Sequence, residues 1–152
     1  MNQAQWMNEA LALAEEAAAS GEIPVGAIVV DRDGRIIGRG RNRRESGDPL
    51  AHAELIAIRQ AAEVIGDWRL EGTTMVVTLE PCAMCAGALV NARVAKLIFG
   101  AFDPKAGFCG SLGNLVQDAR LNHRLEVISG VEAEASRKLL QGFFQGLRKR
   151  LD

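Results

Sequence analysis

The feature of this sequence that most constrains its fold is a helical segment between two apolar strands. Residues 73–79 (TTMVVTL) and residues 95–100 (AKLIFG) are short apolar runs with the composition of buried strands. Residues 81–92 lie between these runs and are predicted to form a helix that Pro81 opens. A strand, a helix and a second strand in this order predict a parallel pair with a right-handed crossover. The chain therefore belongs to the α/β class.

The remaining predicted elements extend this unit into a larger sheet. The other strands are expected over residues 24–30, 35–41 and 125–129, the first two joined by a turn at Asp33-Gly34. The other helices are expected over residues 3–20, 51–65 and 131–151. The order α-β-β-α-β-α-β-β-α predicts a three-layer α/β/α architecture, with a mixed five-stranded sheet and helices on both faces.

Two of these helices carry apolar residues at steps of three and four, which is typical of a buried stripe. In the helix over residues 51–65 the predicted stripe is Leu55, Ile58, Ala62 and Ile65. In the last helix it is Leu140, Phe144, Leu147 and Leu151, which are interpreted first as core residues.

Length and composition exclude several classes of protein. The 152 residues fit one domain spanning residues 1–152, and 48% hydrophobic with 24% charged residues exclude intrinsic disorder. The apolar runs are shorter than the roughly 18 residues that a membrane span needs. Residues 1–20 contain three acidic residues and neither Lys nor Arg, unlike a secretory or mitochondrial leader. We therefore expect a cytoplasmic protein with no membrane partner.

The cysteines favour a metal site over a disulfide framework. There are three, Cys82, Cys85 and Cys109, and the odd count with the two-residue gap in the first pair argues against paired disulfides. Cys82 and Cys85 lie on one face at the start of a helix, where the helix dipole stabilises thiolates. Two thiolates and the imidazole of His52 suit tetrahedral Zn²⁺ and leave one position open for water.

Glu54 is the candidate catalytic residue beside this predicted site. It shares a helical face with Ile58, Ala61 and Ile65. A carboxylate on an apolar face is costly to bury unless it has an interaction partner or a catalytic role. Two thiolates already neutralise Zn²⁺, so the ion is a weaker acid for water than a site with three histidines. A nearby carboxylate can take the proton from water and later deliver it to the substrate. Attack of that water on an sp² carbon bearing an amine is hydrolytic deamination.

Simpler readings of the same residues exist. A lone Cys-x-x-Cys can be a redox pair, and a lone His at a helix start is usually a cap or a core residue. A closed structural zinc site would need a fourth ligand, for which His123 and Cys109 are the available candidates.

The motifs His52-Ala53-Glu54 and Pro81-Cys82-Ala83-Met84-Cys85 resemble those of the zinc-dependent nucleobase deaminase superfamily, whose signature and mechanism are well described. The sequence is similar to the bacterial tRNA adenosine deaminases from about residue 6 to residue 148. Further segments carry this likeness: 22–27 (EIPVGA), 48–49 (DP), 78–82 (TLEPC), 99–101 (FGA), 110–112 (GSL) and 122–124 (NHR). The resemblance implies a cytidine-deaminase-like fold, one zinc ion per subunit, a homodimer, and conversion of adenosine to inosine at the wobble position of a tRNA anticodon.

The resemblance also implies a role for individual residues. His52, Cys82 and Cys85 would bind zinc, and Glu54 would move protons. The expected substrate-binding residues in the anticodon stem-loop complex are Asn42, Ala53 (through its backbone), Asp103, Lys105, Asn122 and Phe144. The neighbouring Phe143 could share the role of Phe144, and Cys109 is expected to be a free, inert thiol.

Two other functions stay open on the sequence alone. One is deamination of a free base or nucleotide, such as guanine, cytosine or deoxycytidylate, because such enzymes share the zinc motifs. The other is a zinc-stabilised RNA-binding module without activity. Basic residues cluster at residues 39–44 and 148–150, but a net charge of −1 does not indicate a strongly basic nucleic-acid binder.

Overall fold

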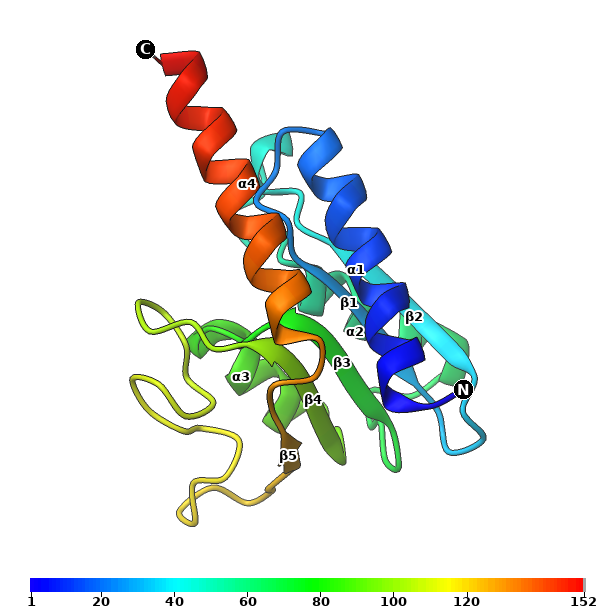
Figure 1. Ribbon diagram of the computed structural model, residues 1–152. Coiled ribbons are helices and arrows are strands. Elements are labelled where there is room, and N and C mark those ends of the chain that lie inside the picture. Colours follow the sequence, from blue (N-terminus) through cyan, green and yellow to red (C-terminus); the bar gives the residue numbers. More distant parts are fainter. Residues whose placement is uncertain (152) are drawn as a thin grey trace.

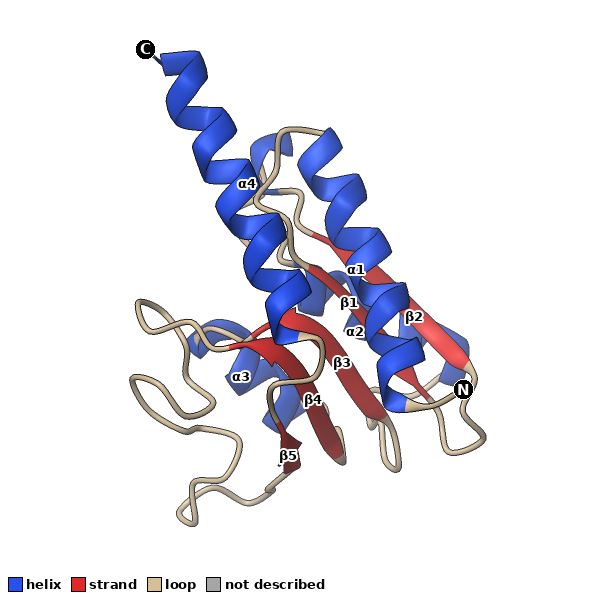
Figure 2. Ribbon diagram, in the orientation of Figure 1, coloured by secondary structure: helices blue, strands red, loops and turns tan. Residues whose placement is uncertain are grey.

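The computed structural model describes residues 1–151 and has the predicted three-layer architecture (Figures 1 and 2). Its strands are β1 (Gly26–Val30), β2 (Ile36–Arg41), β3 (Thr74–Leu79), β4 (Lys96–Ala101) and β5 (Glu126–Ile128). Its helices are α1 (Gln3–Ala19), α2 (Ala53–Ile65), α3 (Ala83–Asn91) and α4 (Ala133–Leu151), with a short 3₁₀ helix, η1, over Arg44–Ser46.

The five strands form one mixed sheet in the order β2-β1-β3-β4-β5. β1 is antiparallel to both β2 and β3, whereas β3, β4 and β5 run parallel to one another. The predicted crossover through α3 therefore joins the parallel pair β3 and β4 at the centre of the sheet.

Alternate residues of the central strands enter two separate cores. Ile28, Val30, Val76 and Ile98 pack with residues of α1 and α4 on one face of the sheet. The residues between them, such as Val29, Val77 and Phe99, pack with α2 and α3 on the other face. Helices on both faces follow from this alternation, because each strand is apolar on both of its sides.

The predicted stripe of α2 is wrong in detail. Its buried residues are Ala53, Glu54, Ala57 and Ala61, whereas Ile65 is exposed. The glycines of β2 explain why the buried residues of α2 that face the sheet are small. A Cβ at Gly38 would lie 2.2 Å from the carbonyl oxygen of Ala57, and one at Gly40 would lie 2.1 Å from that of Ala53.

The stripe predicted for the last helix is not core either. Leu140 is half-buried, and Phe144, Leu147 and Leu151 are exposed. Figure 1 gives the reason, since the C-terminal part of α4 runs past the end of the sheet. The hydroxyl of Ser136 anchors the other end by donating to the carbonyl of Thr78 (2.6 Å).

Other differences from the sequence prediction concern the ends of elements. α3 begins at Ala83 rather than Pro81, with Cys82 as its N-cap, and α2 begins at Ala53 with His52 as its N-cap. β1 and β5 are shorter than predicted, and α4 starts at Ala133. No helix within residues 1–151 combines the length and apolar character that crossing a bilayer requires.

Candidate active site and metal centre

The candidate site lies at one edge of the sheet, where several element ends meet. The C-terminal ends of β2, β3 and β4 point to this edge, as does the N-terminal end of the antiparallel β1. The N-termini of α2 and α3 also contribute, because each begins with a predicted metal ligand as its N-cap.

The structure brings the three predicted metal ligands together. His52 Nδ1 lies 3.6 Å from Cys82 Sγ and 3.5 Å from Cys85 Sγ. Cys85 is fully buried, and His52 and Cys82 are half-buried. Within residues 1–151 these three are the one group of His, Cys and acidic side chains arranged to hold a metal ion. We refer to them as the His/Cys/Cys cluster.

The three side chains of this cluster have pKa values that are shifted in different directions. A hydrogen bond from Cys85 lowers the pKa of the Cys82 thiol to about 4, and His52 contributes in the same direction. The same sulfur contact and burial raise the pKa of Cys85. The hydrogen bond to Cys82 raises the pKa of His52. The cluster therefore has a strong tendency to hold at least one thiolate, which is the form that binds metals.

Glu54 is buried next to the cluster, in the first turn of α2. It is 4% exposed, and burial raises the pKa of its carboxyl group from 4.5 to about 7. A carboxyl group that titrates near neutrality can accept and release a proton at physiological pH. This is the behaviour expected of a general acid and base.

A pocket of about 710 Å³ opens over the cluster and Glu54. Its lining combines buried polar groups with exposed side chains and includes seven residues predicted from the sequence. These are Asn42, Glu54, Asp103, Lys105 and Phe144, together with the metal ligands His52 and Cys82.

Asn42 is a buried residue of this lining, and hydrogen bonds within the protein already use part of its amide group. Its Oδ1 accepts a hydrogen bond from the Ala53 N–H (3.0 Å), and its Nδ2 donates to the carbonyl of Ile23 (3.2 Å). One amide hydrogen and one oxygen lone pair remain available for a ligand. Ala53 itself is fully buried, and its N–H is committed to Asn42.

Asp103 and Lys105 lie in the loop over residues 102–113, at the other side of the pocket. The Asp103 carboxylate closes a tight turn by accepting from the N–H groups of Lys105 (3.1 Å) and Ala106 (3.3 Å). This turn leaves the ammonium group of Lys105 exposed at the pocket.

The two adjacent phenylalanines of α4 face different surfaces. Phe144 is 39% exposed and lines the pocket over the cluster. Phe143 lines a shallower groove that α4 forms with Ala18 at the end of α1. The structure therefore separates two residues that the sequence could not.

Like Ala53, Asn122 is a predicted substrate-binding residue that the structure leaves outside the lining of this pocket. It is exposed in the connection that leads to β5. The neighbouring His123 directs its Nε2 to the carbonyl of Val94 (2.6 Å). Cys109 is buried, and this burial raises the pKa of its thiol to about 12. Neither His123 nor Cys109 is part of the His/Cys/Cys cluster, so neither provides the fourth ligand of a closed site.

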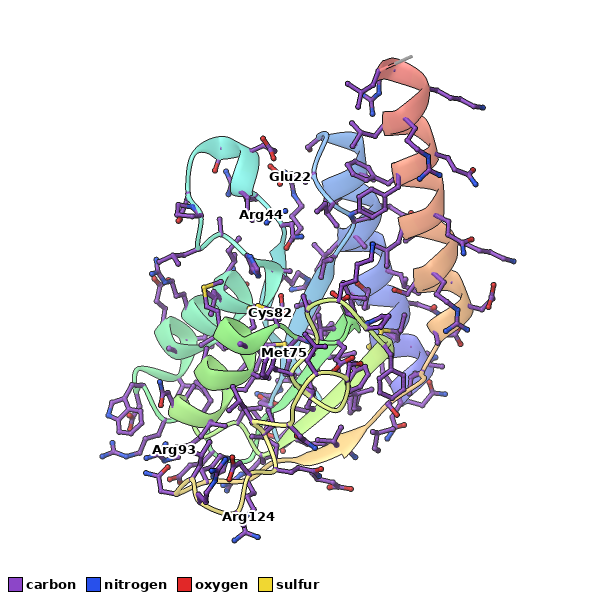
Figure 3. All side chains as sticks on the ribbon, turned by 90° about the vertical axis from the view of Figure 1, so that its left-hand side faces the viewer. Glu22, Arg44, Met75, Cys82, Arg93 and Arg124 are labelled. Carbon is purple, nitrogen blue, oxygen red and sulfur yellow. The ribbon has the colours of Figure 1, made fainter. Side chains whose placement is uncertain are left out.

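Three further charged or aromatic residues at the pocket were not among the sequence predictions. Arg44 in η1 and Phe102 after β4 are exposed, and Glu80 after β3 is 2% exposed (Figure 3 shows Arg44 and Cys82). Glu80 and Phe102 directly follow parallel strands, a position that would have marked them as candidates. Nothing in the local sequence distinguishes Arg44 from the basic residues around it.

Comparison with known proteins gives the same picture over most of the chain. Residues 1–148 match the family model of the MafB19-like deaminases. The tRNA-specific adenosine deaminase of Bacillus subtilis is 51% identical over 146 residues, which cover 95% of this chain and 90% of that one.

Solved structures agree with this match. A tRNA:A34 deaminase, described in work on A-to-I editing at the wobble position, superposes with a TM-score of 0.85 at 42% identity. That match covers 90% of this chain and 99% of the other. A guanine deaminase from Nitrosomonas europaea superposes with a TM-score of 0.80 at 25% identity, over 92% of this chain and 83% of the other.

The sequence and structural matches thus agree with the arrangement of the cluster, Glu54 and the pocket. The chain belongs to the MafB19-like deaminases and, within them, to the family of tRNA-specific adenosine deaminases.

Proposed function

We propose that this protein hydrolyses adenosine to inosine, with release of ammonia, at the wobble position of a tRNA anticodon. The observation that carries the proposal is the buried Glu54 carboxyl group beside the His/Cys/Cys cluster in an open pocket. The identity of 51% with the B. subtilis tRNA-specific adenosine deaminase supports the choice of substrate.

Zinc is the metal that best fits the cluster. Typical Zn–S and Zn–N bonds of about 2.3 and 2.0–2.1 Å with a tetrahedral angle would separate nitrogen and sulfur by about 3.5 Å. The His52 Nδ1 distances of 3.6 and 3.5 Å to the two sulfurs agree with this separation. One zinc ion held by His52, Cys82 and Cys85 in each subunit would supply a Lewis acid that lowers the pKa of water.

Glu54 performs the proton transfers in this proposal. Its carboxylate takes a proton from the attacking water, whose oxygen forms a bond to C6 of the adenine. The carboxylic acid then protonates the ring nitrogen N1, and a second transfer through the same group allows the C6–N bond to break. Adenosine and water are thereby converted to inosine and ammonia, and Glu54 returns to its starting state. A pKa of about 7 suits a group that must both take and give the proton.

The remaining predicted residues hold the RNA. The free amide positions of Asn42 suit hydrogen bonds to the target nucleotide, and Ala53 supports the base edge through its backbone and fixes Asn42. Lys105 and Asp103 contact the anticodon loop at one side of the pocket, and Phe144 stacks on an unpaired base or sugar. Asn122, outside the pocket, contacts nucleotides further from the target.

The same family assignment leads us to propose a cytoplasmic homodimer, as the sequence resemblance implies. The dimer predicts twice the 16.3 kDa mass of one chain in solution. Sedimentation equilibrium measures this mass directly, and a single species of 16.3 kDa at micromolar concentration would contradict it.

Deamination of a free base is the second candidate, and the likeness to the guanine deaminase favours it. That likeness is at 25% identity, against 42% for the tRNA:A34 deaminase. The exposed Lys105 and Phe144 at the pocket also favour a larger, single-stranded substrate.

Glu54→Gln tests the proposed chemistry, because it keeps the shape of the side chain and removes its titration. We expect one zinc ion per chain, measured by metal analysis, and inosine formation reduced at least about a hundredfold on an anticodon stem-loop. Turnover within about threefold of the wild-type rate would remove Glu54 from the mechanism.

A further inference from the structure

Glu80 is a buried carboxylate in the pocket that the proposed chemistry does not use. It follows β3, precedes the metal ligand Cys82 by two residues, and is 2% exposed. No basic side chain forms an ion pair with it among residues 1–151. Such a group is costly to bury unless hydrogen bonds satisfy it.

Four hydrogen bonds satisfy this carboxylate, and all come from the loop over residues 102–113. Oε1 accepts from the Asp103 N–H (2.9 Å) and from the Ser111 hydroxyl. Oε2 accepts from the N–H groups of Cys109 (3.1 Å) and Ser111 (2.9 Å). The loop carries Asp103 and Lys105, so one carboxylate fixes the segment that faces the substrate.

The loop also reaches the metal-binding segment directly. Gly107 forms an antiparallel bridge with Cys82, and the Phe108 N–H donates to the carbonyl of Pro81 (2.9 Å). A Cβ at Gly107 would lie 2.2 Å from Cδ of Glu80, so only glycine permits this close approach. Glu80 thus lies between a metal ligand and the loop that lines the opposite side of the pocket.

We propose that Glu80 is a positioning residue that fixes the 102–113 loop relative to the metal ligands, so that the RNA enters the pocket correctly for attack. This inference rests on the proposed function. Glu80 acts through the loop, because its carboxylate accepts from three backbone N–H groups and one hydroxyl of the loop, and none of these donors belongs to a predicted metal ligand. Its loss should therefore affect binding of the stem-loop more than the chemical step.

The arrangement requires both carboxylate oxygens. A glutamine has one acceptor oxygen and an NH₂ donor, so Glu80→Gln would point two donors at each other in a buried space. The side chain keeps its length and volume in this variant. Hydrogen bonds to a charged acceptor are the stronger kind, so the effect on the loop should be large.

Hydrogen exchange by NMR measures the loop without substrate. In the wild-type protein we expect slow exchange at the N–H groups of Asp103, Cys109 and Ser111. In Glu80→Gln we expect exchange at these three groups to rise at least about tenfold, with the strands β1 and β3 unchanged and full zinc content. A uniform rise across the whole chain would indicate general destabilisation and would overturn the proposal.

Kinetics on an anticodon stem-loop give the second readout. We expect Glu80→Gln to raise KM about tenfold or more and to change kcat by less than about threefold. Ser111→Ala, which removes one of the four bonds from an exposed residue, should raise KM by a smaller factor. If Glu80→Gln does not fold, the KM of Ser111→Ala still tests whether the hydrogen bonds to Glu80 affect binding of the stem-loop. Leu112→Ala is the matched control, since this residue is 57% exposed in the same loop and does not line the pocket.

Unchanged KM in Glu80→Gln and Ser111→Ala, or a fall in kcat alone, would contradict the proposal. The two hypotheses fail in different ways. If the wild-type protein does not deaminate the stem-loop, the proposed function fails. The exchange experiment still decides whether Glu80 holds the loop.

Discussion

The buried carboxyl group of Glu54 makes the stability of the metal-free protein depend on pH. Its pKa is raised from 4.5 to about 7 by burial, so between these values the folded state keeps a proton that the unfolded state has lost. The free energy of unfolding therefore falls as pH rises through this range. Below about pH 4.5 the group is neutral in both states and contributes no penalty.

Glu54→Gln should remove this pH-dependent penalty. We expect the stability of the variant relative to wild type to grow by about 3 kcal/mol between pH 4 and pH 8. Urea unfolding of both metal-free proteins at several pH values measures the difference. A difference that does not change with pH would mean that Glu54 is not buried as a titrating acid.

The three cysteines give a matched test of the metal ligands. Cys82→Ala should reduce the zinc content from one ion per chain to below about one tenth, and should abolish the stabilisation that zinc provides. Cys109→Ala removes another buried thiol that lies outside the cluster, so its zinc content should stay at one. Metal analysis and thermal unfolding with and without a chelator distinguish the two variants. Full zinc content in Cys82→Ala would contradict the ligand assignment.

At this scale the sequence predicted the cluster of candidate metal ligands better than the contacts made by the loops. His52, Cys82 and Cys85 were identifiable as a group because their residue types and spacing, taken together, favour a metal site, and Glu54 follows His52 by two residues. Arg44 and the hydrogen-bond partners of Glu80 were not identifiable, because an arginine among arginines has common structural explanations and the position of Glu80 after a strand does not show which loop residues it contacts. Their position depends on loops whose path no local pattern fixes.

Packing of α2 against β2 is the main element-level feature that the sequence did not reveal. Leu55, Ile58, Ala62 and Ile65 have the stronger apolar periodicity, but the face against the sheet carries alanines. The reason is the close approach of the two backbones at Gly38 and Gly40, which a pattern of apolar residues cannot show. This approach carries His52 and Glu54, at the start of α2, to the site.

Gly38→Ala should therefore be strongly destabilising. Its Cβ would lie 2.2 Å from the Ala57 carbonyl oxygen, so helix and strand must separate, at a cost of about 2–3 kcal/mol. Gly146→Ala in α4 is the control, because nothing lies within 4 Å of its added Cβ. It should stabilise the helix by up to about 1 kcal/mol. Equal effects of the two substitutions on chemical denaturation would contradict the packing described here.

The position of α4 assigns different roles to its adjacent aromatic residues. Phe144→Ala should raise KM for the stem-loop about tenfold while leaving zinc content and stability near wild type, because stacking on one base is lost. Phe143→Ala should leave KM unchanged, since Phe143 lines the groove beside α1. Steady-state kinetics compare the two variants. A larger effect of Phe143→Ala on KM would reverse the assignment.

For the molecule as a whole, the fold makes the site out of separate parts of the chain. Ends of four strands and two helices converge at one edge of the sheet, and the C-terminal helix reaches the same pocket from the opposite end of the sequence. The three-layer architecture was predictable because the apolar strands and the right-handed crossover are compatible with few sheet topologies. The exposed end of α4 was not, because its apolar stripe also fits a core helix.

The central claim is that this pocket deaminates adenosine in a tRNA anticodon loop, and ammonia release tests it most directly. The zinc-loaded protein is assayed with an anticodon stem-loop carrying adenosine at the wobble position and with the same loop carrying guanosine. Free adenosine, cytidine, deoxycytidylate and guanine complete the panel. The account predicts ammonia and inosine from the adenosine stem-loop alone. Turnover of a free base or nucleotide, with the adenosine stem-loop unchanged, would contradict it.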